Sequence, residues 1–260
     1  MNLLNAIILG IVEGITEFLP VSSTAHLIIS SKFLHIPQTD FQKFFEVFIQ
    51  SGAICAIVIL YFKYVLKRKK TVKNIFFSFV PTALIGLVLY KIIKKIFFES
   101  YFLIIFSMIF FGIIFLIVEY LITTKRLVLK KKLEKTSWKE AVFIGINQAI
   151  AVVPGVSRSG IVMVTMMGLG YMREESAVYS FLLAVPTIFA ASVLDVYKMK
   201  SILFTSSQGN LVYLVIGFSV SFITAYLSVK WLISFLQKKS LVLFGWYRII
   251  FGILLLILGK

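Results

Sequence analysis

The chain has 260 residues, a mean hydropathy of +0.98, only 15% charged residues and a formal net charge of +16. This composition is too apolar for a soluble globular domain, and a single cysteine, Cys55, excludes a disulfide framework or a cysteine metal site. The basic residues fall between apolar segments rather than on a soluble amphipathic face, which excludes a nucleic-acid-binding protein. The sequence therefore predicts a polytopic helical membrane protein.

The first apolar segment, residues 2–35, is interrupted by Pro20. Proline removes a backbone hydrogen-bond donor and clashes with the preceding turn, so the helix should break there. Irregular backbone at membrane depth is tolerated only where protein or a watery cavity surrounds it. We therefore expect a re-entrant helical hairpin rather than a straight span.

Ionisable and hydroxyl side chains gather in this hairpin, in the stretch EGITEFLPVSSTAH (13–26). Glu13 and Glu17 are four residues apart and share one helix face. They would hold Mg²⁺ or Ca²⁺ through oxygen ligands or, alternatively, point as a plain pair into a loop or the membrane interface. Ser23 and His26 are three residues apart and so are neighbours on one helix face. There they would form a nucleophile with its base, or His26 itself would attack. The competing interpretation is a helix-capping serine and a hydrogen-bonded histidine without a chemical role.

Three continuous apolar spans follow, at 41–62, 75–93 and 101–122. They approach or reach the ~20 residues that cross a hydrocarbon core. The intervening loop 63–74 and the later loop 123–140 hold six and seven Lys or Arg residues. The positive-inside rule places both loops in the cytoplasm, so the first hairpin would enter from the outer face.

A second interrupted segment, 141–172, breaks at Pro154 and Gly155. With the basic loops inside, this second hairpin would enter from the inner face. Three further spans are predicted after it, at 177–197, 211–236 and 245–259.

The second break carries the stretch PGVSRSG (154–160). Gly155 frees the backbone to take conformations that other residues resist. Ser157, Arg158 and Ser159 would present hydroxyls and a guanidinium fork that matches phosphate oxygens. The alternative is a structural ion pair between Arg158 and one of the two glutamates of the first hairpin.

The two interrupted segments also resemble each other. Residues 9–25 and 144–160 align without gaps at an offset of 135, with Glu13 opposite Gln148 and Ser22 opposite Ser157. We expect an all-α polytopic membrane protein with six transmembrane helices and two re-entrant helical hairpins, arranged as an inverted-topology repeat. Residues 1–135 and 136–260 would form the two repeats of one integral membrane domain. Because transporters use this architecture, an inverted-repeat transporter or a lipid flippase is the alternative function.

EGITEFLPVSSTAH and PGVSRSG resemble the two signature motifs of the bacterial undecaprenyl-diphosphate phosphatase family, also called the bacitracin-resistance proteins. FEVFIQSGA (45–53) and FLLAVP (181–186) resemble further family segments. The resemblance implies a hydrolase that converts undecaprenyl diphosphate to undecaprenyl phosphate and recycles the lipid carrier for peptidoglycan. It also implies a divalent cation, Mg²⁺ or Ca²⁺, and a site open to the outer face of the bacterial plasma membrane.

The resemblance also assigns roles to individual residues. Glu13 and Glu17 match the metal-binding carboxylates. The catalytic set it implies is Glu17, Ser23, His26 and Arg158. The substrate-binding set is Ser22, Thr24, Gln50, Gly155, Ser157, Arg158 and Ser159. Whether Ser23 or His26 attacks stays open. The chain departs from the family pattern at Val162, where threonine is usual, and at Val178 and Tyr179, where Glu-Phe is usual.

The expected partners are the polyprenyl diphosphate substrate and membrane lipids, with a homodimer as a further option and no nucleic acid. The alternative function is an inverted-repeat transporter or, given the resemblance, a polyprenyl-phosphate flippase. Ser23 beside His26 distinguishes the enzyme from both, because transport has no need of a nucleophile with its base.

Overall fold

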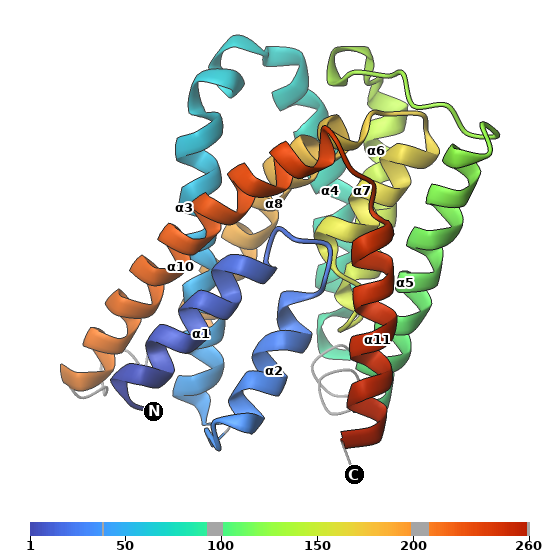
Figure 1. The fold of residues 1–260 in the computed structure, drawn as a ribbon. Coiled ribbons are helices and arrows are strands. Elements are labelled where there is room, and N and C mark those ends of the chain that lie inside the picture. The colour runs from blue at the N-terminus through green and yellow to red at the C-terminus, as the bar shows by residue number, and fades with distance from the viewer. Residues whose placement is uncertain (38, 93–100, 199–207, 259–260) are drawn as a thin grey trace.

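The computed structural model describes residues 1–37, 39–92, 101–198 and 208–258, and this part of the chain is helical apart from turns, loops and one isolated bridge pair (Figure 1). Two short 3₁₀ turns are η2 (Leu133–Lys135) and η3 (Ala149–Val152). The helices are α1 (Leu3–Thr16), α2 (Ser23–Phe33), α3 (Asp40–Lys67), α4 (Lys69–Ile92), α5 (Tyr101–Thr123), α6 (Trp138–Gln148), α7 (Arg158–Gly168), α8 (Arg173–Lys198), α10 (Gln208–Leu236) and α11 (Val242–Leu258). The all-helical prediction is confirmed.

Five helices are long and apolar enough to cross a membrane: α3, α4, α5, α8 and α10. They coincide with five of the six predicted spans. The sixth prediction falls on α11, which has 17 residues and is apolar but shorter. Residues 93 and 259, the predicted ends of two spans, lie outside the described residues. The chain is therefore a multi-pass membrane protein.

Both interrupted segments break where the prolines predict. The first runs as α1, a turn at residues 17–22 and α2, and the second as α6, η3, a turn at residues 153–157 and α7. In Figure 1, α1 and α2 extend toward the end of the molecule where both termini lie, whereas α6 and α7 extend toward the opposite end. The two turns thus approach each other near the middle of the molecule.

Each turn ends on a serine with an unusual backbone conformation. Ser22 precedes α2 with φ 74°, and Ser157 precedes α7 with φ 72°. A positive φ is uncommon for residues other than glycine, so each serine restarts its helix from a strained conformation.

The first helix of each hairpin packs mainly against a helix of the other half of the chain. The helix α1 lies along α10, and α6 lies along α4. A Cβ at Gly145 would lie 2.0 Å from the Ser78 carbonyl oxygen, so α6 and α4 approach as closely as backbones allow. Thr82 Oγ1 on α4 donates to Gly145 O at 2.7 Å, and Thr224 Oγ1 on α10 donates to Val220 O at 2.8 Å and lies 3.4 Å from Gly10 O.

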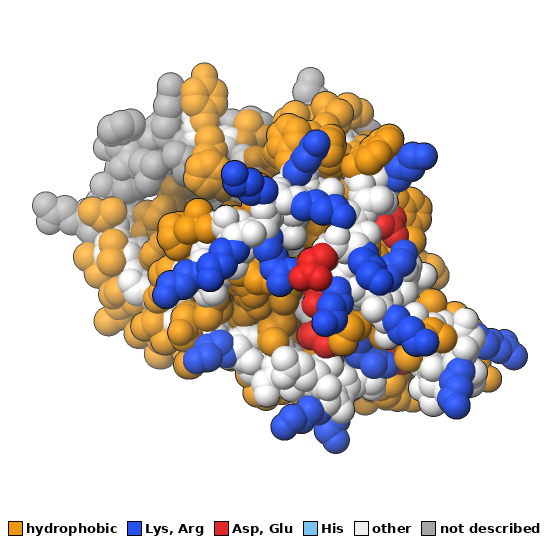
Figure 2. Space-filling view, turned by 90° about the horizontal axis from the view of Figure 1, so that it is seen from above, with side chains coloured by type: hydrophobic (Ala, Val, Ile, Leu, Met, Phe, Trp, Pro, Cys, Tyr) orange, Lys and Arg blue, Asp and Glu red, His pale blue; other side chains and the backbone are white. Residues whose placement is uncertain are grey.

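Lysine and arginine side chains gather at one end of the molecule, which we call the basic face, made of residues 67–73 and 125–139 (Figure 2). Arg68 pairs with Glu134, and Lys70 Nζ donates to Glu134 O at 2.6 Å, so the two basic segments lie side by side. Beneath them, Arg173 pairs with the buried Glu119, whose carboxylate also accepts from the backbone N–H of Leu241 at 2.8 Å.

Candidate active site

A cavity of about 170 Å³ lies where the two hairpin turns meet α3 and α8. Its lining combines residues that are far apart in the sequence, and both hairpins, α3 and α8 contribute polar side chains to it. The lining residues are Glu17, Ser22, Ser23, Thr24, Gln50, Ala151, Val153, Pro154, Gly155, Ser157, Arg158, Thr187, Ile188 and Ala191. Among these are eight of the residues that the sequence predicted for the site: Glu17, Ser22, Ser23, Thr24, Gln50, Gly155, Ser157 and Arg158.

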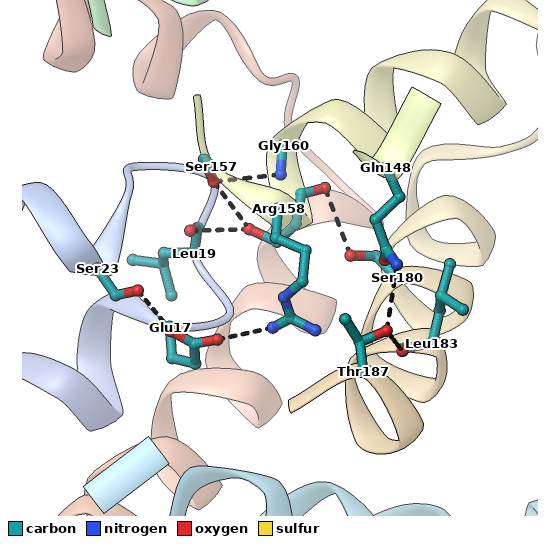
Figure 3. A network of polar contacts seen from close by, with 11 residues as sticks. Glu17, Leu19, Ser23, Gln148, Ser157, Arg158, Gly160, Ser180, Leu183 and Thr187 are labelled. Carbon is teal, nitrogen blue, oxygen red and sulfur yellow. Dashed lines mark hydrogen bonds and ion pairs between the residues drawn. The ribbon is translucent and has the colours of Figure 1, made fainter. Parts of the chain in front are cut away.

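A chain of hydrogen bonds crosses from the first hairpin to the second (Figure 3). Ser23 Oγ donates to Glu17 Oε2 at 2.5 Å, and Arg158 Nη2 donates to Glu17 Oε1 at 2.8 Å. The side chains of Glu17 and Arg158 are 6% and 14% exposed, so this ion pair is shielded from bulk solvent. The sequence analysis offered a structural ion pair between Arg158 and a glutamate as an alternative. That pair is present with Glu17, and both of its residues line the cavity.

Glu13 lies behind this chain and is fully buried. Neither of its carboxylate oxygens has a hydrogen-bond partner among the described residues. The charges that act on it come from Glu17, Arg158 and Glu46. Burying a carboxylate is costly unless the group is paired, protonated or bound to a cation.

His26 faces away from the cavity, and the described lining does not include it. Its Nδ1 lies 2.8 Å from Ser22 O, and its Nε2 lies 2.6 Å from the Tyr247 hydroxyl. The imidazole also stacks on Phe251, with ring centroids 4.8 Å apart and an angle of 5° between the planes. The structure therefore places His26 against α11, outside the described cavity lining that includes Ser23 and Arg158.

Hydroxyl groups fasten the second turn to the first. Ser157 Oγ accepts from the Gly160 backbone N–H at 3.2 Å, and it lies 3.1 Å from Ser159 Oγ. Ser159 in turn donates to Leu19 O at 3.0 Å, so this predicted substrate-binding residue bridges the hairpins behind the cavity rather than lining it. Gly155 has φ 93°, and a Cβ there would lie 2.5 Å from Ile104 O, so a side chain would be strained and crowded.

Two departures from the family pattern lie in buried packing. Val162 is fully buried within an apolar cluster of α7 and its neighbours. The Tyr179 hydroxyl lies 2.7 Å from Ser78 Oγ and 3.1 Å from Asn74 O, so it joins α8 to α4. Neither side chain is part of the described cavity lining.

The sequence analysis missed several residues around the site. Thr187 lines the cavity and accepts from Gln148 Nε2 at 3.1 Å. Tyr247, Arg248 and Phe251 on α11 contact His26 or the hairpin turns. An arginine inside the last apolar span, in GWYRIIFGILL, was the available signal, because charged residues at membrane depth are costly and usually functional.

Glu13 and Glu17 are the residues that could hold a divalent cation. In the described part of the chain, no group of three or more His, Cys, Asp or Glu side chains is arranged as a metal site. Magnesium commonly uses one or two carboxylates and completes its shell with water and phosphate oxygens. The unpartnered Glu13 carboxylate beside Glu17 fits that kind of site.

Comparison with known proteins places these residues in a family context. Residues 6–254 match the family described as bacitracin resistance protein BacA. A protein from Sulfurihydrogenibium sp. (strain YO3AOP1) is 45% identical over 254 residues, covering 98% of each chain. Proteins from Aquifex aeolicus (strain VF5) and Campylobacter fetus subsp. fetus (strain 82-40) are each 43% identical, covering 95% and 99% of each chain. All three relatives are named undecaprenyl-diphosphatase.

Proposed function

The chain belongs to the bacitracin resistance protein BacA family, and on this premise we propose that it is an undecaprenyl-diphosphatase. It hydrolyses undecaprenyl diphosphate to undecaprenyl phosphate and inorganic phosphate, and so returns the lipid carrier to cell-wall synthesis. One observation carries the proposal: a serine, a carboxylate and an arginine from two separate hairpins form one hydrogen-bonded chain beside a cavity. The serine–carboxylate bond favours hydrolysis over transport, because carrying a lipid across the membrane needs no activated hydroxyl.

Ser23 is the nucleophile in this proposal. Glu17 accepts the hydroxyl proton as Ser23 Oγ attacks the terminal phosphorus. An O–P bond to the serine forms, the anhydride O–P bond breaks, and undecaprenyl phosphate leaves with the proton that Glu17 has taken. Water then attacks the phosphoserine while Glu17 takes a proton from it. The serine recovers that proton as inorganic phosphate departs.

His26 has a supporting role in this scheme. Both of its ring nitrogens are engaged away from the cavity, one with Ser22 O and the other with the Tyr247 hydroxyl. Because Ser22 directly precedes the nucleophile, these contacts help to fix the direction of the Ser23 hydroxyl. His26 is therefore a positioning residue rather than the attacking group.

Arg158 clamps the anionic substrate. Its Nη1 is buried and has no hydrogen-bond partner within the described structure, while Nη2 is paired with Glu17. A guanidinium fork binds two phosphate oxygens at once, and it neutralises charge in the transition state. Ser22, Thr24, Gln50, Gly155 and Ser157 line the same cavity and complete the substrate-binding set, with Ser159 behind them.

We propose that Glu13 and Glu17 hold the divalent cation, Mg²⁺ or Ca²⁺. When bound, such an ion neutralises negative charge on the diphosphate oxygens. Glu13 would contribute a carboxylate that is otherwise buried without a partner among the described groups. Glu17 would orient the ion toward the cavity that it lines.

The inverted-repeat arrangement, with α11 as the sixth span, is likewise a proposal. The reciprocal packing of α1 on α10 and of α6 on α4 supports it, because each first helix contacts the fourth helix of the other half. A threonine hydroxyl also lies near the carbonyl of each of two aligned glycines, Gly10 and Gly145, which are 135 residues apart.

We further propose that the basic face lies in the cytoplasm and the cavity opens to the outer face of the bacterial plasma membrane. The helix α8 starts near the basic face, where Arg173 pairs with Glu119. The cavity-lining residues of α8, from Thr187 to Ala191, come 14 to 18 positions later, on the way to the opposite end (Figure 1).

Phosphate release by purified protein in detergent tests the function, because a micelle supports no membrane gradient. With Mg²⁺ and a long-chain polyprenyl diphosphate, we expect turnover by the wild type and a loss of about 1,000-fold or more in Ser23→Ala. Ser219→Ala, an exposed serine on α10, is the matched control and should keep wild-type turnover. Full activity of Ser23→Ala would refute the nucleophile, and a wild type without turnover would refute the phosphatase itself.

A further inference from the structure

Arg248 on α11 is the largest fully buried side chain among the described residues, with 0% exposure. Its guanidinium donates to three backbone carbonyls: Nε to Met108 O at 3.3 Å, Nη1 to Pro20 O at 3.2 Å and Nη2 to Gly155 O at 2.5 Å. One side chain thus contacts α5 and both hairpin turns.

The two turn carbonyls are equivalent positions of the internal repeat. Pro20 and Gly155 are separated by 135 residues, the offset at which the hairpins align. Both lie at the break of a helix, where carbonyls lack the amide partners that a continuous helix would supply. Arg248 therefore satisfies the same backbone position in both repeats with the two arms of one fork.

The charge of Arg248 is not balanced by a carboxylate. Within the described structure it forms no ion pair, and its guanidinium lies 5.4 Å from the centre of the Phe115 ring. A buried cation is tolerated when its donors are hydrogen-bonded, and here carbonyl oxygens serve that purpose. These hydrogen bonds restrict the distance between the carbonyls of Pro20 and Gly155, because a planar guanidinium holds its two acceptors at a fixed separation.

We propose that Arg248 is a positioning residue that clamps the two hairpin turns together and so sets the geometry of the catalytic groups. Pro20 is three residues from both Glu17 and Ser23, and Gly155 is three residues before Arg158. A shift of either carbonyl would change the 2.8 Å contact between Arg158 and Glu17. The catalytic part of this inference rests on the proposed phosphatase function, whereas the clamp itself does not.

Two arginine variants separate the clamp from general stability. Arg248→Met removes the fork and the charge, while Arg248→Gln keeps a neutral amide donor. Arg173→Met is the matched control, because it removes a partly buried arginine at the start of α8, away from the hairpin turns. Phosphate release, scaled to the folded fraction, gives kcat and KM. Hydrogen–deuterium exchange of peptides covering 17–24 and 153–160 reports opening of the two turns.

For Arg248→Met we expect faster exchange in both turns and a kcat at least about tenfold lower, since small displacements of reacting groups are costly. KM should change less than kcat. Arg248→Gln should lie between this variant and the wild type, and it keeps the test decisive if the methionine variant does not fold. Arg173→Met should leave exchange in both turns and kcat at wild-type values.

Faster exchange in only one turn, or in neither, would overturn the clamp. Faster exchange in both turns with an unchanged kcat would overturn the link to catalysis. If the wild type released no phosphate, the proposed function would fail while the exchange experiment still decided the clamp.

Discussion

The two hairpins share a backbone plan and differ in the chemistry they carry. Each breaks at a proline-containing turn and restarts on a serine with positive φ, Ser22 or Ser157. Each also presents one equivalent carbonyl, of Pro20 or Gly155, to the same arginine on α11. The repeated features are those that let a chain stop, turn and restart in the middle of a membrane protein.

The side chains on this shared plan are divided between the two hairpins. Glu17 of the first hairpin aligns with Val152 of the second, and Ser23 aligns with Arg158. In the proposed mechanism the first hairpin supplies the acidic and nucleophilic groups, and the second supplies the guanidinium. That mechanism needs both sets of groups, so it requires the two turns to meet.

Of the changes that test this division between the hairpins, removing the guanidinium of the second hairpin should have the largest effect. Arg158→Ala takes away the guanidinium that faces Glu17 and the cavity, so we expect kcat/KM to fall by about 100-fold or more. Phosphate-release kinetics measure it, and Arg126→Ala, an exposed basic-face arginine, serves as the control. Activity near the wild-type value would mean that the chemistry is not divided between the hairpins as described.

Replacing Glu13 by glutamine, the residue at the aligned position 148 of the second hairpin, should have the next largest effect. In Glu13→Gln the first hairpin carries the amide of the second and loses a proposed cation ligand. We expect the Mg²⁺ concentration for half-maximal activity to rise about tenfold or more. A titration of activity against free Mg²⁺ measures this, with Glu134→Gln on the basic face as control. An unchanged titration would place the cation elsewhere.

A third prediction concerns the feature that the hairpins share. Because Ser22 has φ 74°, a β-branched residue should be strained there. We expect Ser22→Val to lower the free energy of unfolding by about 1–3 kcal/mol, and Ser22→Gly to lower it far less. Thermal unfolding in detergent compares the two variants. Equal stability of both would show that the positive φ is not maintained in the folded protein.

The smallest effect is expected at the start of the second hairpin, outside the membrane spans. Burial raises the pKa of Glu140, but hydrogen bonds from Lys131 and Ser137 outweigh it and lower this pKa to about 2 from the usual 4.5. The ionised form therefore stabilises the fold above pH 4.5, and this stabilisation is lost as the pH falls toward 2.

The variant Glu140→Gln keeps the capping-box geometry and removes the charge. Because the ion pair with Lys131 is partly exposed, we expect a stability loss below about 1 kcal/mol at neutral pH. Melting temperatures of the two proteins should converge toward pH 2, and a constant difference would contradict the assignment.

Local signals made much of the fold predictable. Proline acts on its own turn, so the breaks near Pro20 and Pro154 could be located without knowing any tertiary contact. Span length and basic loops are equally local, and the described helices follow them. The resemblance of the two short motifs to a known family supplied the candidate residues.

Tertiary packing produces contacts that the sequence could not indicate. The spacing of Ser23 and His26 is compatible with a reacting pair, but α2 turns the imidazole toward Tyr247 and Phe251 on α11. The contacts of Arg248 were also out of reach, because they join residues 93 and 228 positions away. The roles of the site residues and the metal remain predictions that the variants above can test.

The packing of α1 on α10 has a consequence for biosynthesis. Residues 3–16 leave the ribosome long before residues 208–236 have been made. The first hairpin, which carries Glu13 and Glu17, is therefore synthesised before the helix against which α1 packs. A chain that ends before α10 and α11 lacks this packing surface, so translation yields a working enzyme only once residues 208–258, about the last fifth of the chain, have been inserted into the bilayer.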